Sequence, residues 1–569
     1  MKRVVLLLLL TLSVGAMYSQ KKDFNQVAEK QRQLFQQYRD NQKQKYDEYR
    51  QRQNQQYVDF MRQKWDLFNS MPALKPKDEP PVPPVIYEEP KPEPAPAPAP
   101  KPEPAPAPKP EPKPAPAPAP APKPEPAPAP KPEPAPAPAP KPEPAPAPAP
   151  KPEPAPAPKP EPAPAPAPKP SPKPVIIDDD NVIVIDTTPL PKPEPIAPVK
   201  PIEQDEKIVG VNLYGTLASI AFPKDASFKI HDVTSDGLAD AWQELSEDKY
   251  NVTIATCLQQ KKDLSLCDWA YLQMLLQVSK KQYDDTNEAI VMTAYLLAQS
   301  GYKVRLGIHE EKVYLLLASH HTIYNMVYYT KDGEKFYVIN HDDEESMYIC
   351  PAMYEKEQRL SLAINAEQKF DYEPSEVRHV KSAKGVEANI LVNTNMIAFY
   401  NDYPTGCYDE NFVSRWANYA NTKMEKNIQD NLYPQLRQAI AGKSQIDAVN
   451  ILLNWVQTCF VYGYDDQVWG KDRAFFPAET LYYPYSDCED RSILFSRLVR
   501  DLLGLDVLLL YYPGHLATAV CVDESQLRGD YLLYNNRKFM VCDPTYINAP
   551  AGATMPKMNN NEAKVILLN

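Results

Sequence analysis

Cys488, His515 and Asp543 have the types and the chain order of a nucleophile, a base and an orienting acid. A cysteine thiolate attacks a carbonyl carbon, an imidazole takes up and returns the proton, and a carboxylate fixes the tautomer and orientation of the imidazole. Attack of this kind on an amide gives a thioester. The three residues therefore predict acyl transfer at a cysteine, provided that the fold brings them together.

The cysteine stands where a helix is expected to begin. The apolar residues that follow it at helical spacing are Ile493, Leu494, Leu498 and Leu502. Gly504 suits a left-handed C-cap, and Ser486 or Asp487 is the natural N-cap. Cys488 then lies in the first turn, where unpaired N–H groups and the helix dipole favour a thiolate and could receive an oxyanion.

The two partners of the cysteine are expected at strand ends. Residues 506–512 are typical of a buried strand, Pro513-Gly514 breaks it, and His515 opens a second strand. A further strand pair is predicted on either side of the turn Asn535-Asn536, and Asp543 follows its second strand directly before a proline. From boundaries of this kind a rigid scaffold can present side chains to a cleft.

The sequence around these residues resembles the transglutaminase-like superfamily, whose members have a papain-like Cys-His-Asp fold. The likeness is carried by three short runs, Asp487-Cys488-Glu489-Asp490, Tyr512-Pro513-Gly514-His515 and Cys542-Asp543-Pro544-Thr545. Residues 448–462, with Arg473 and residues 478–481, look like the helix and loop that precede the cysteine in that family. The resemblance covers roughly residues 410–550 and points to an exported bacterial protein with a proline-rich spacer.

This resemblance implies an exported transglutaminase-like cysteine acyltransferase or amidase/peptidase, with hydrolysis favoured over cross-linking. Cys488 would attack a peptide, protein or peptidoglycan-like amide, His515 would relay the proton, and Asp543 would hold the imidazole. No cofactor and no metal are implied. The residue that completes the oxyanion site stays open, and those plausible by position are Trp469, Tyr462 and Tyr464.

Plainer interpretations of the same residues also stay open. A lone cysteine is most often a small buried hydrophobe, and a histidine beside a strand can be an ordinary core residue. A scaffold of this kind can also have lost its activity. The second function class is therefore a non-catalytic cell-envelope scaffold or binding module displayed on the proline-rich spacer.

The N-terminus is expected to be a signal peptide, residues 1–19. A basic Met1-Lys2-Arg3 precedes an apolar stretch of signal-peptide length, which ends at the polar Tyr18-Ser19-Gln20. No cysteine lies near this junction, so a lipoprotein anchor is not expected, and no later run is apolar and long enough for a membrane helix. The sequence predicts export to the periplasm, the cell surface or the medium, with an uncleaved anchor as the alternative.

Residues 20–70 carry an 11-residue aromatic repeat. One series is Phe24, Phe35, Tyr46, Tyr57 and Phe68, and the other is Val27, Tyr38, Tyr49 and Phe60. A period of 11 is about 3.67 residues per turn, so both series line one face of a long helix. The helix cannot bury this stripe alone. The pattern predicts parallel self-association as a coiled coil through residues 24–68 or docking on an envelope surface, and a solvated single helix is the alternative.

Residues 76–205 form a predicted disordered spacer. Its Lys-Pro-Glu-Pro and Ala-Pro units lack backbone donors at alternate positions and favour polyproline II over helix or sheet. At about 3.1 Å per residue the proline-rich run would reach on the order of 250 Å. We interpret it as a spacer whose length lets the globular region reach a distant partner, or as a passive linker whose length does not matter. The apolar residues 175–185 within it could add a strand to a neighbour.

The globular region is expected to be α+β and to contain an internal duplication. Residues 401–569 form the predicted transglutaminase-like catalytic domain. Residues 206–400 look like a degenerate copy of it, in which similar residues lie a constant number of positions earlier in the chain. In that register Asp285, Lys312 and Asn340 stand at or near the three triad positions. The first copy is therefore expected to pack or to bind a ligand rather than to catalyse.

The net charge of −12 argues against a nucleic-acid partner. Eight cysteines in an exported chain invite disulfides, and Cys521 and Cys542 are either buried thiols or a pair. No Cys-x-x-Cys occurs, which argues against zinc. His320-His321 is not expected to bind a metal, because neighbouring side chains on a strand point to opposite faces.

Overall fold

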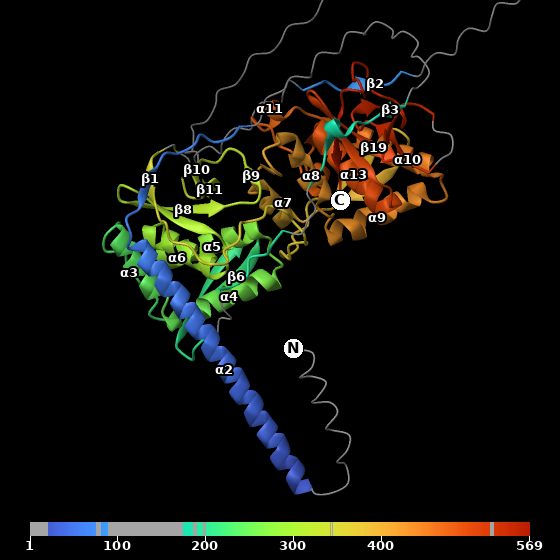
Figure 1. Ribbon diagram of the computed structural model, residues 1–569. Coiled ribbons are helices and arrows are strands. Elements are labelled where there is room, and N and C mark those ends of the chain that lie inside the picture. The colour runs from blue at the N-terminus through green and yellow to red at the C-terminus, as the bar shows by residue number, and fades with distance from the viewer. Residues whose placement is uncertain are drawn as a thin grey trace, which may run out of the picture. The chain divides into compact units, whose positions relative to one another are not determined.

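The computed structural model describes residues 21–75, 81–88, 174–185, 190–196, 201–341, 343, 345–523 and 528–569. The chain divides into two units, and the described residues all belong to the unit formed by Met1–Glu88 and Ser171–Asn569. Helices and sheets are both present, so the fold mixes α and β elements (Figure 1). The predicted signal peptide and residues 89–173 of the predicted spacer lie outside the described residues.

A seven-stranded sheet forms the basis of residues 401–569. Its strands are β3 (Val175–Ile176), β4 (Val182–Ile183), β18 (Val507–Tyr512), β19 (His515–Cys521), β20 (Tyr531–Tyr534), β21 (Arg537–Cys542) and β23 (Lys564–Leu567). The order β3-β20-β21-β19-β18-β23-β4 puts β19 at the centre, antiparallel to both of its neighbours. Every residue of β19 is buried. The strands predicted on both sides of Pro513-Gly514 are confirmed as β18 and β19.

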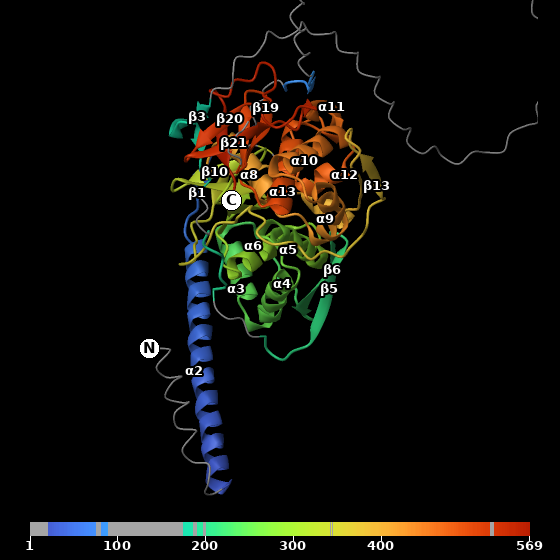
Figure 2. The same cartoon turned by 90° about the vertical axis from the view of Figure 1, so that its right-hand side faces the viewer.

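The helix α13 (Cys488–Leu503) begins at the candidate nucleophile, as predicted. The Asp487 side chain caps it by accepting hydrogen bonds from the backbone N–H groups of Glu489 and Asp490. Gly504 ends it in the left-handed conformation, with φ of 65°. The helix packs against β18 and β19 and against α10 (Gln445–Cys459) (Figure 2). The helix therefore lies against the two central strands β18 and β19.

Residues 206–400 contain a sheet with the same arrangement of four strands. These are β7 (Val304–His309), β8 (Lys312–Ala318), β10 (Tyr328–Lys331) and β11 (Glu334–Val338), and β12 (Met347–Ile349) lies beside β7. Their order β7-β8-β11-β10 repeats the order β18-β19-β21-β20. The register repeats as well, because Val304 pairs with Leu317 as Val507 pairs with Val520. α6 (Asn287–Gln299) packs on this sheet as α13 does on the other.

The remaining elements connect and cover these two sheets. The helices are α3 (Ser235–Leu245), α4 (Asn251–Asp263), α5 (Asp268–Tyr283), α7 (Thr394–Asn401), α8 (Arg415–Asn421), α9 (Lys426–Ile440), α11 (Asp465–Val468) and α12 (Pro477–Tyr482). The short strand pairs are β5 (Glu206–Leu213) with β6 (Thr216–Pro223), β9 (Thr322–Ile323) with β15 (Gly406–Cys407), β13 (Arg378–Lys381) with β14 (Glu387–Ile390), and β16 (Val461–Tyr462) with β17 (Tyr485–Ser486). Among the helices that the structure describes, none combines the length and the apolar character needed to cross a membrane.

The N-terminal helix α2 (Lys21–Met61) docks on residues 206–400 through its C-terminal end (Figure 1). Tyr57 is fully buried between Trp242 and Tyr354, with ring centroids 4.6 and 4.5 Å away. Arg50 is buried and pairs with Asp248 at 2.8 Å. β1 (Asp66–Phe68) then adds an edge strand next to β12.

This docking corrects the prediction of self-association at Tyr57 of the aromatic stripe. Two rings of the same chain accept Tyr57, so no second molecule is needed there. Toward the N-terminus the stripe is exposed at Phe35, Tyr38 and Tyr46. Phe60, near the C-terminal end of α2, is 41% exposed as well, so the prediction of a partner applies to these exposed residues.

The segments on both sides of the proline-rich run pair with strands of residues 401–569. Before it, β2 (Val85–Ile86) pairs in parallel with β22 (Tyr546–Ile547). After it, β3 and β4 extend the seven-stranded sheet at its two edges, which confirms that this apolar stretch adds strands to a neighbour. Both ends are therefore attached to residues 401–569. Since α2 itself docks on residues 206–400, the proline-rich segment does not hold α2 away from the globular region, as the predicted spacer would.

Candidate active site

His515 and Asp543 form a buried pair. Nε2 of His515 lies 2.9 Å from Oδ2 of Asp543. The sheet explains this contact, because His515 opens β19 and Asp543 follows β21, the antiparallel neighbour of β19. Burial opposes ionisation of Asp543, but the charge and hydrogen bond of His515 and the donors of Thr545 outweigh it and hold the pKa of Asp543 below its ordinary value. Asp543 is therefore an ionised acceptor that orients His515.

The other carboxylate oxygen of Asp543 is held by its own loop. Oδ1 accepts hydrogen bonds from the N–H and the hydroxyl of Thr545, both at 2.9 Å, and from the N–H of Tyr546 at 3.2 Å. Gln457 of α10 donates to the carbonyl oxygens of Asp543 and Tyr546, at 3.0 and 2.8 Å. No sequence pattern pointed to Gln457, because a glutamine on a helix is common. These contacts leave the Asp543 carboxylate a single orientation.

Cys488 lies on the face of α13 that meets the start of β19. One turn further along α13, Ser492 donates its hydroxyl hydrogen to the carbonyl oxygen of Leu516 at 2.9 Å. The N–H of Leu516, the residue after His515, interacts with the Cys488 thiol. Nδ1 of His515 is buried and has no hydrogen-bond partner among the described residues, the thiol included. The thiol, through Leu516, and the imidazole thus both lie at the start of β19, without a hydrogen bond between them.

The acidity of Cys488 differs from the prediction. A position in the first turn of a helix is expected to favour the thiolate, yet burial, followed by the charges of Asp487 and Glu489, raises the pKa of the Cys488 thiol well above its ordinary value. The prediction was wrong because two carboxylates flank the cysteine and only 5% of Cys488 is exposed. At neutral pH the resting sulfur is a thiol, which needs a base to become a nucleophile.

Replacing Asp487 by Asn should make Cys488 more reactive. Asn caps helices as well as Asp does, so α13 keeps its cap while the sulfur loses a neighbouring charge. Burial raises the pKa of Asp487 to about 6, so this charge is present at pH 7.5. The thiol pKa should fall as that charge is lost, and alkylation by iodoacetamide should become about 3- to 10-fold faster. Asp466→Asn, at an exposed acid on α11, is the control, and wild-type rates for Asp487→Asn across a pH series would contradict this expectation.

A cluster of carboxylates that the sequence did not reveal surrounds the start of α13. Oxygens of Asp465, Asp472 and Glu489 lie within 4.8 Å of one another. Burial and then the charge of Asp487 raise the pKa of Asp465 to about 9. Such oxygens could hold a hard cation. Arg415 supplies a positive charge there, with Nη2 at 3.1 Å from Asp472 and 3.3 Å from Glu489.

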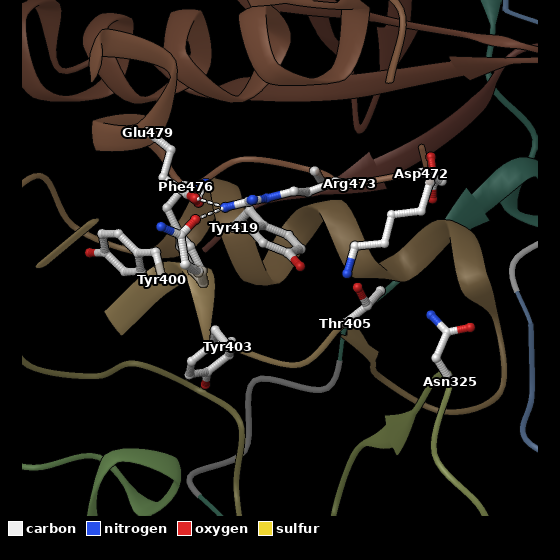
Figure 3. A pocket seen from close by; sticks show the side chains of 12 residues that line it. Asn325, Tyr400, Tyr403, Thr405, Tyr419, Asp472, Arg473, Phe476 and Glu479 are labelled. Atoms are coloured by element: carbon white, nitrogen blue, oxygen red, sulfur yellow. Dashed lines mark hydrogen bonds and ion pairs between the residues drawn. The ribbon is translucent and has the colours of Figure 1, made fainter. Parts of the chain in front are cut away.

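A cavity beside this cluster is lined by aromatic and polar side chains. Figure 3 shows Arg473 extending toward Glu479, with which it forms an ion pair. The other labelled lining residues are Asn325, Tyr400, Tyr403, Thr405, Tyr419, Asp472 and Phe476. Cys488, His515 and Asp543 do not line this cavity. It is therefore separate from the place where the predicted chemistry would occur.

The corresponding positions of residues 206–400 lack the three functional groups of the triad. Asp285 and Lys312 are exposed. The side chain of Asn340 accepts the N–H of Leu315 and donates to the carbonyl oxygen of Val313, so it joins the end of β11 to β8. The first half keeps the helix and the strands of the second half with different residues where Cys488, His515 and Asp543 lie.

The cysteines form no disulfides, and His321 of the histidine pair is held in the core. All eight cysteines are free thiols, so Cys521 and Cys542 are not bonded to each other. His321 is buried, and its Nδ1 accepts the N–H of Leu362 at 3.1 Å. His320 is half-buried beside it.

Comparisons of the chain with protein-family models, with curated proteins and with solved structures gave no match. The functional assignment therefore depends on the geometry of the site. That geometry is a helix start, a strand start and a strand end that meet at one place.

Proposed function

We propose that this protein is a cysteine acyltransferase or amidase that works through a thioester on Cys488, in the manner of the transglutaminase-like superfamily that its sequence resembles. The observation that carries the proposal is the state of His515. Its Nε2 is paired with Asp543 at 2.9 Å, while its Nδ1 is buried without a partner in the described part of the chain. A buried nitrogen without a hydrogen bond lowers the stability of the fold. A role as the acceptor of the thiol proton explains why His515 keeps such a nitrogen.

The proposed reaction has two steps. Nδ1 of His515 takes the proton from Sγ of Cys488, the sulfur bonds to the carbonyl carbon of an amide, and the amine leaves with that proton as the thioester forms. Water or an amine then gives a proton to the same nitrogen and attacks the thioester, and the sulfur leaves as a thiolate that takes this proton back from His515. Asp543 stays ionised and stabilises the imidazolium. The proposed substrates are peptide, protein or peptidoglycan-like amides, in keeping with predicted export.

Labelling of the thiols tests this proposal. Iodoacetamide at pH 7.5 should alkylate Cys488 of the wild type about 10²-fold faster than Cys488 of the His515→Ala variant, because the base is missing in the variant. Mass spectrometry reads each cysteine separately. The half-buried Cys459 of α10 is the internal control and should react equally in both proteins. Equal labelling of Cys488 in both would overturn the proposal.

A non-catalytic binding module is the second candidate function, and the burial of the sulfur favours it. Only 5% of Cys488 is exposed, so a substrate reaches the sulfur only after neighbouring side chains move. A first half that keeps the architecture without the triad also fits a binding role. Under this function Cys488→Ala would leave the cellular role intact, whereas removal of the exposed part of α2 would abolish it.

A further inference from the structure

Tyr462 presents a buried hydroxyl oxygen that has no hydrogen-bond partner among the described residues. It belongs to β16, and the parallel pairing of β16 with β17 sets Tyr462 opposite Ser486, two residues before Cys488. The N–H of Gly463 donates to the carbonyl oxygen of Ser486 at 3.3 Å and ties the two segments together. A phenol donor is thus held next to the start of α13.

A buried arginine fixes the ring of Tyr462. The guanidinium of Arg491 lies 5.4 Å from the ring centroid, and Arg491 is only 1% exposed. Its nitrogens donate to Oγ of Ser486 at 3.1 Å and to the carbonyl oxygens of Gln457 and Phe460 at 3.2 and 2.8 Å. These contacts hold the cation over the aromatic face, where it draws electron density from the ring and strengthens the O–H as a donor.

We propose that the hydroxyl of Tyr462 is the hydrogen-bond donor that stabilises the oxyanion formed when Cys488 attacks a carbonyl group. The inference rests on the proposed function. As the sulfur–carbon bond forms, the π electrons of the carbonyl move to its oxygen, and the O–H of Tyr462 donates to that oxygen. When the leaving group departs with its bonding electrons, the carbonyl forms again and the hydroxyl is released.

The hydroxyl of Tyr462 is suited to stabilising the oxyanion because it has no hydrogen-bond partner among the described residues of the resting protein. A donor that is already paired would have to break a bond before it could serve the oxyanion. A donor that gains its partner only in the tetrahedral state stabilises that state more than the bound substrate, and this difference lowers the barrier. Burial raises the pKa of Tyr462, and the thiolate form of Cys488 raises it further, so the phenol keeps its proton.

The two other aromatic residues considered from the sequence are placed less well for this role. Trp469 packs edge-on against Phe475 and Tyr483, with ring centroids 5.6 and 4.8 Å away. The ring of Tyr464 packs edge-on against Tyr462 at 5.2 Å. Its hydroxyl is not among the buried, unpaired groups of the described residues. Of the three residues, only Tyr462 has a buried donor without a hydrogen-bond partner among the described residues.

Two reactions of the full-length protein separate this role from activation of the thiol. Alkylation by iodoacetamide forms no oxyanion, whereas acylation by p-nitrophenyl acetate passes through one and releases p-nitrophenolate. Tyr462→Phe should slow the acylation about 10²- to 10³-fold, the loss typical of removing one oxyanion donor. Its alkylation at Cys488 should change by less than about threefold. Tyr464→Phe removes the same atom from the neighbouring ring and should change neither rate.

Each other outcome overturns the inference. Acylation of Tyr462→Phe at the wild-type rate would overturn it and leave the proposed function standing. Equal losses in both reactions would also overturn it, because Tyr462 would then act on the thiol or on the fold. A wild type that releases p-nitrophenolate no faster than Cys488→Ala would overturn the inference together with the proposed function.

Discussion

Asp543→Asn should slow the acylation of Cys488 by p-nitrophenyl acetate about 10⁴-fold, the loss typical when the acid of such a triad becomes an amide. The reason lies in Thr545, whose N–H and O–H both donate to Oδ1 of Asp543. The amide must keep its oxygen there, so its nitrogen faces Nε2 of His515. Two donors then oppose each other, and the imidazole moves its proton to Nδ1, where it can no longer accept the proton of Cys488.

The Thr545 hydroxyl provides the control for this prediction. Thr545→Val removes one of the donors that fix Oδ1 and should cost little by itself. Combined with Asp543→Asn, it lets the amide turn its oxygen toward His515 more easily and should recover part of the lost rate. The measurement is p-nitrophenolate release, with Cys488→Ala as the blank. If Asp543→Asn stays within tenfold of the wild type, the pair of His515 and Asp543 has a structural role only.

The elements that present the site could be predicted because their signals are local. Asp487 and Gly504 mark the two ends of α13, and both caps are present in the structure. Asn535 and Asn536 both adopt positive φ, at 48° and 58°, in the turn that was expected between two strands. Each of these signals depends on a few neighbouring residues. A single sequence is therefore enough to place Cys488, His515 and Asp543 at their element boundaries.

The surroundings of the site could not be predicted in this way, because they depend on contacts between distant parts of the chain. Arg415 pairs with Glu489 across 74 residues, and Gln457 reaches the carbonyl oxygen of Asp543 across 86. The error in the acidity of Cys488 has the same origin. The helix N-terminus is visible in the sequence, whereas the depth of burial that outweighs it is not.

Tyr57→Ala should lower the free energy of unfolding by about 3–5 kcal/mol, the range for truncation of a large buried ring. Tyr57 is fully buried between the rings of Trp242 and Tyr354. Collapse of the two rings into the cavity is opposed by their own contacts, since Nε1 of Trp242 donates to the hydroxyl of Tyr354 at 3.2 Å. Urea unfolding followed by tryptophan fluorescence measures the loss.

Tyr46 is the matched control, because it holds the same position one repeat earlier in α2 and is 47% exposed. Tyr46→Ala should change the free energy of unfolding by less than about 0.5 kcal/mol. The sequence repeat cannot distinguish the two tyrosines, so a coiled coil would make both substitutions costly and the cost dependent on protein concentration. Docking within one chain makes only Tyr57→Ala costly, at every concentration. Equal losses for the two variants would contradict the docking, and unequal losses leave the exposed end of α2 as the part of the stripe that a partner could bind.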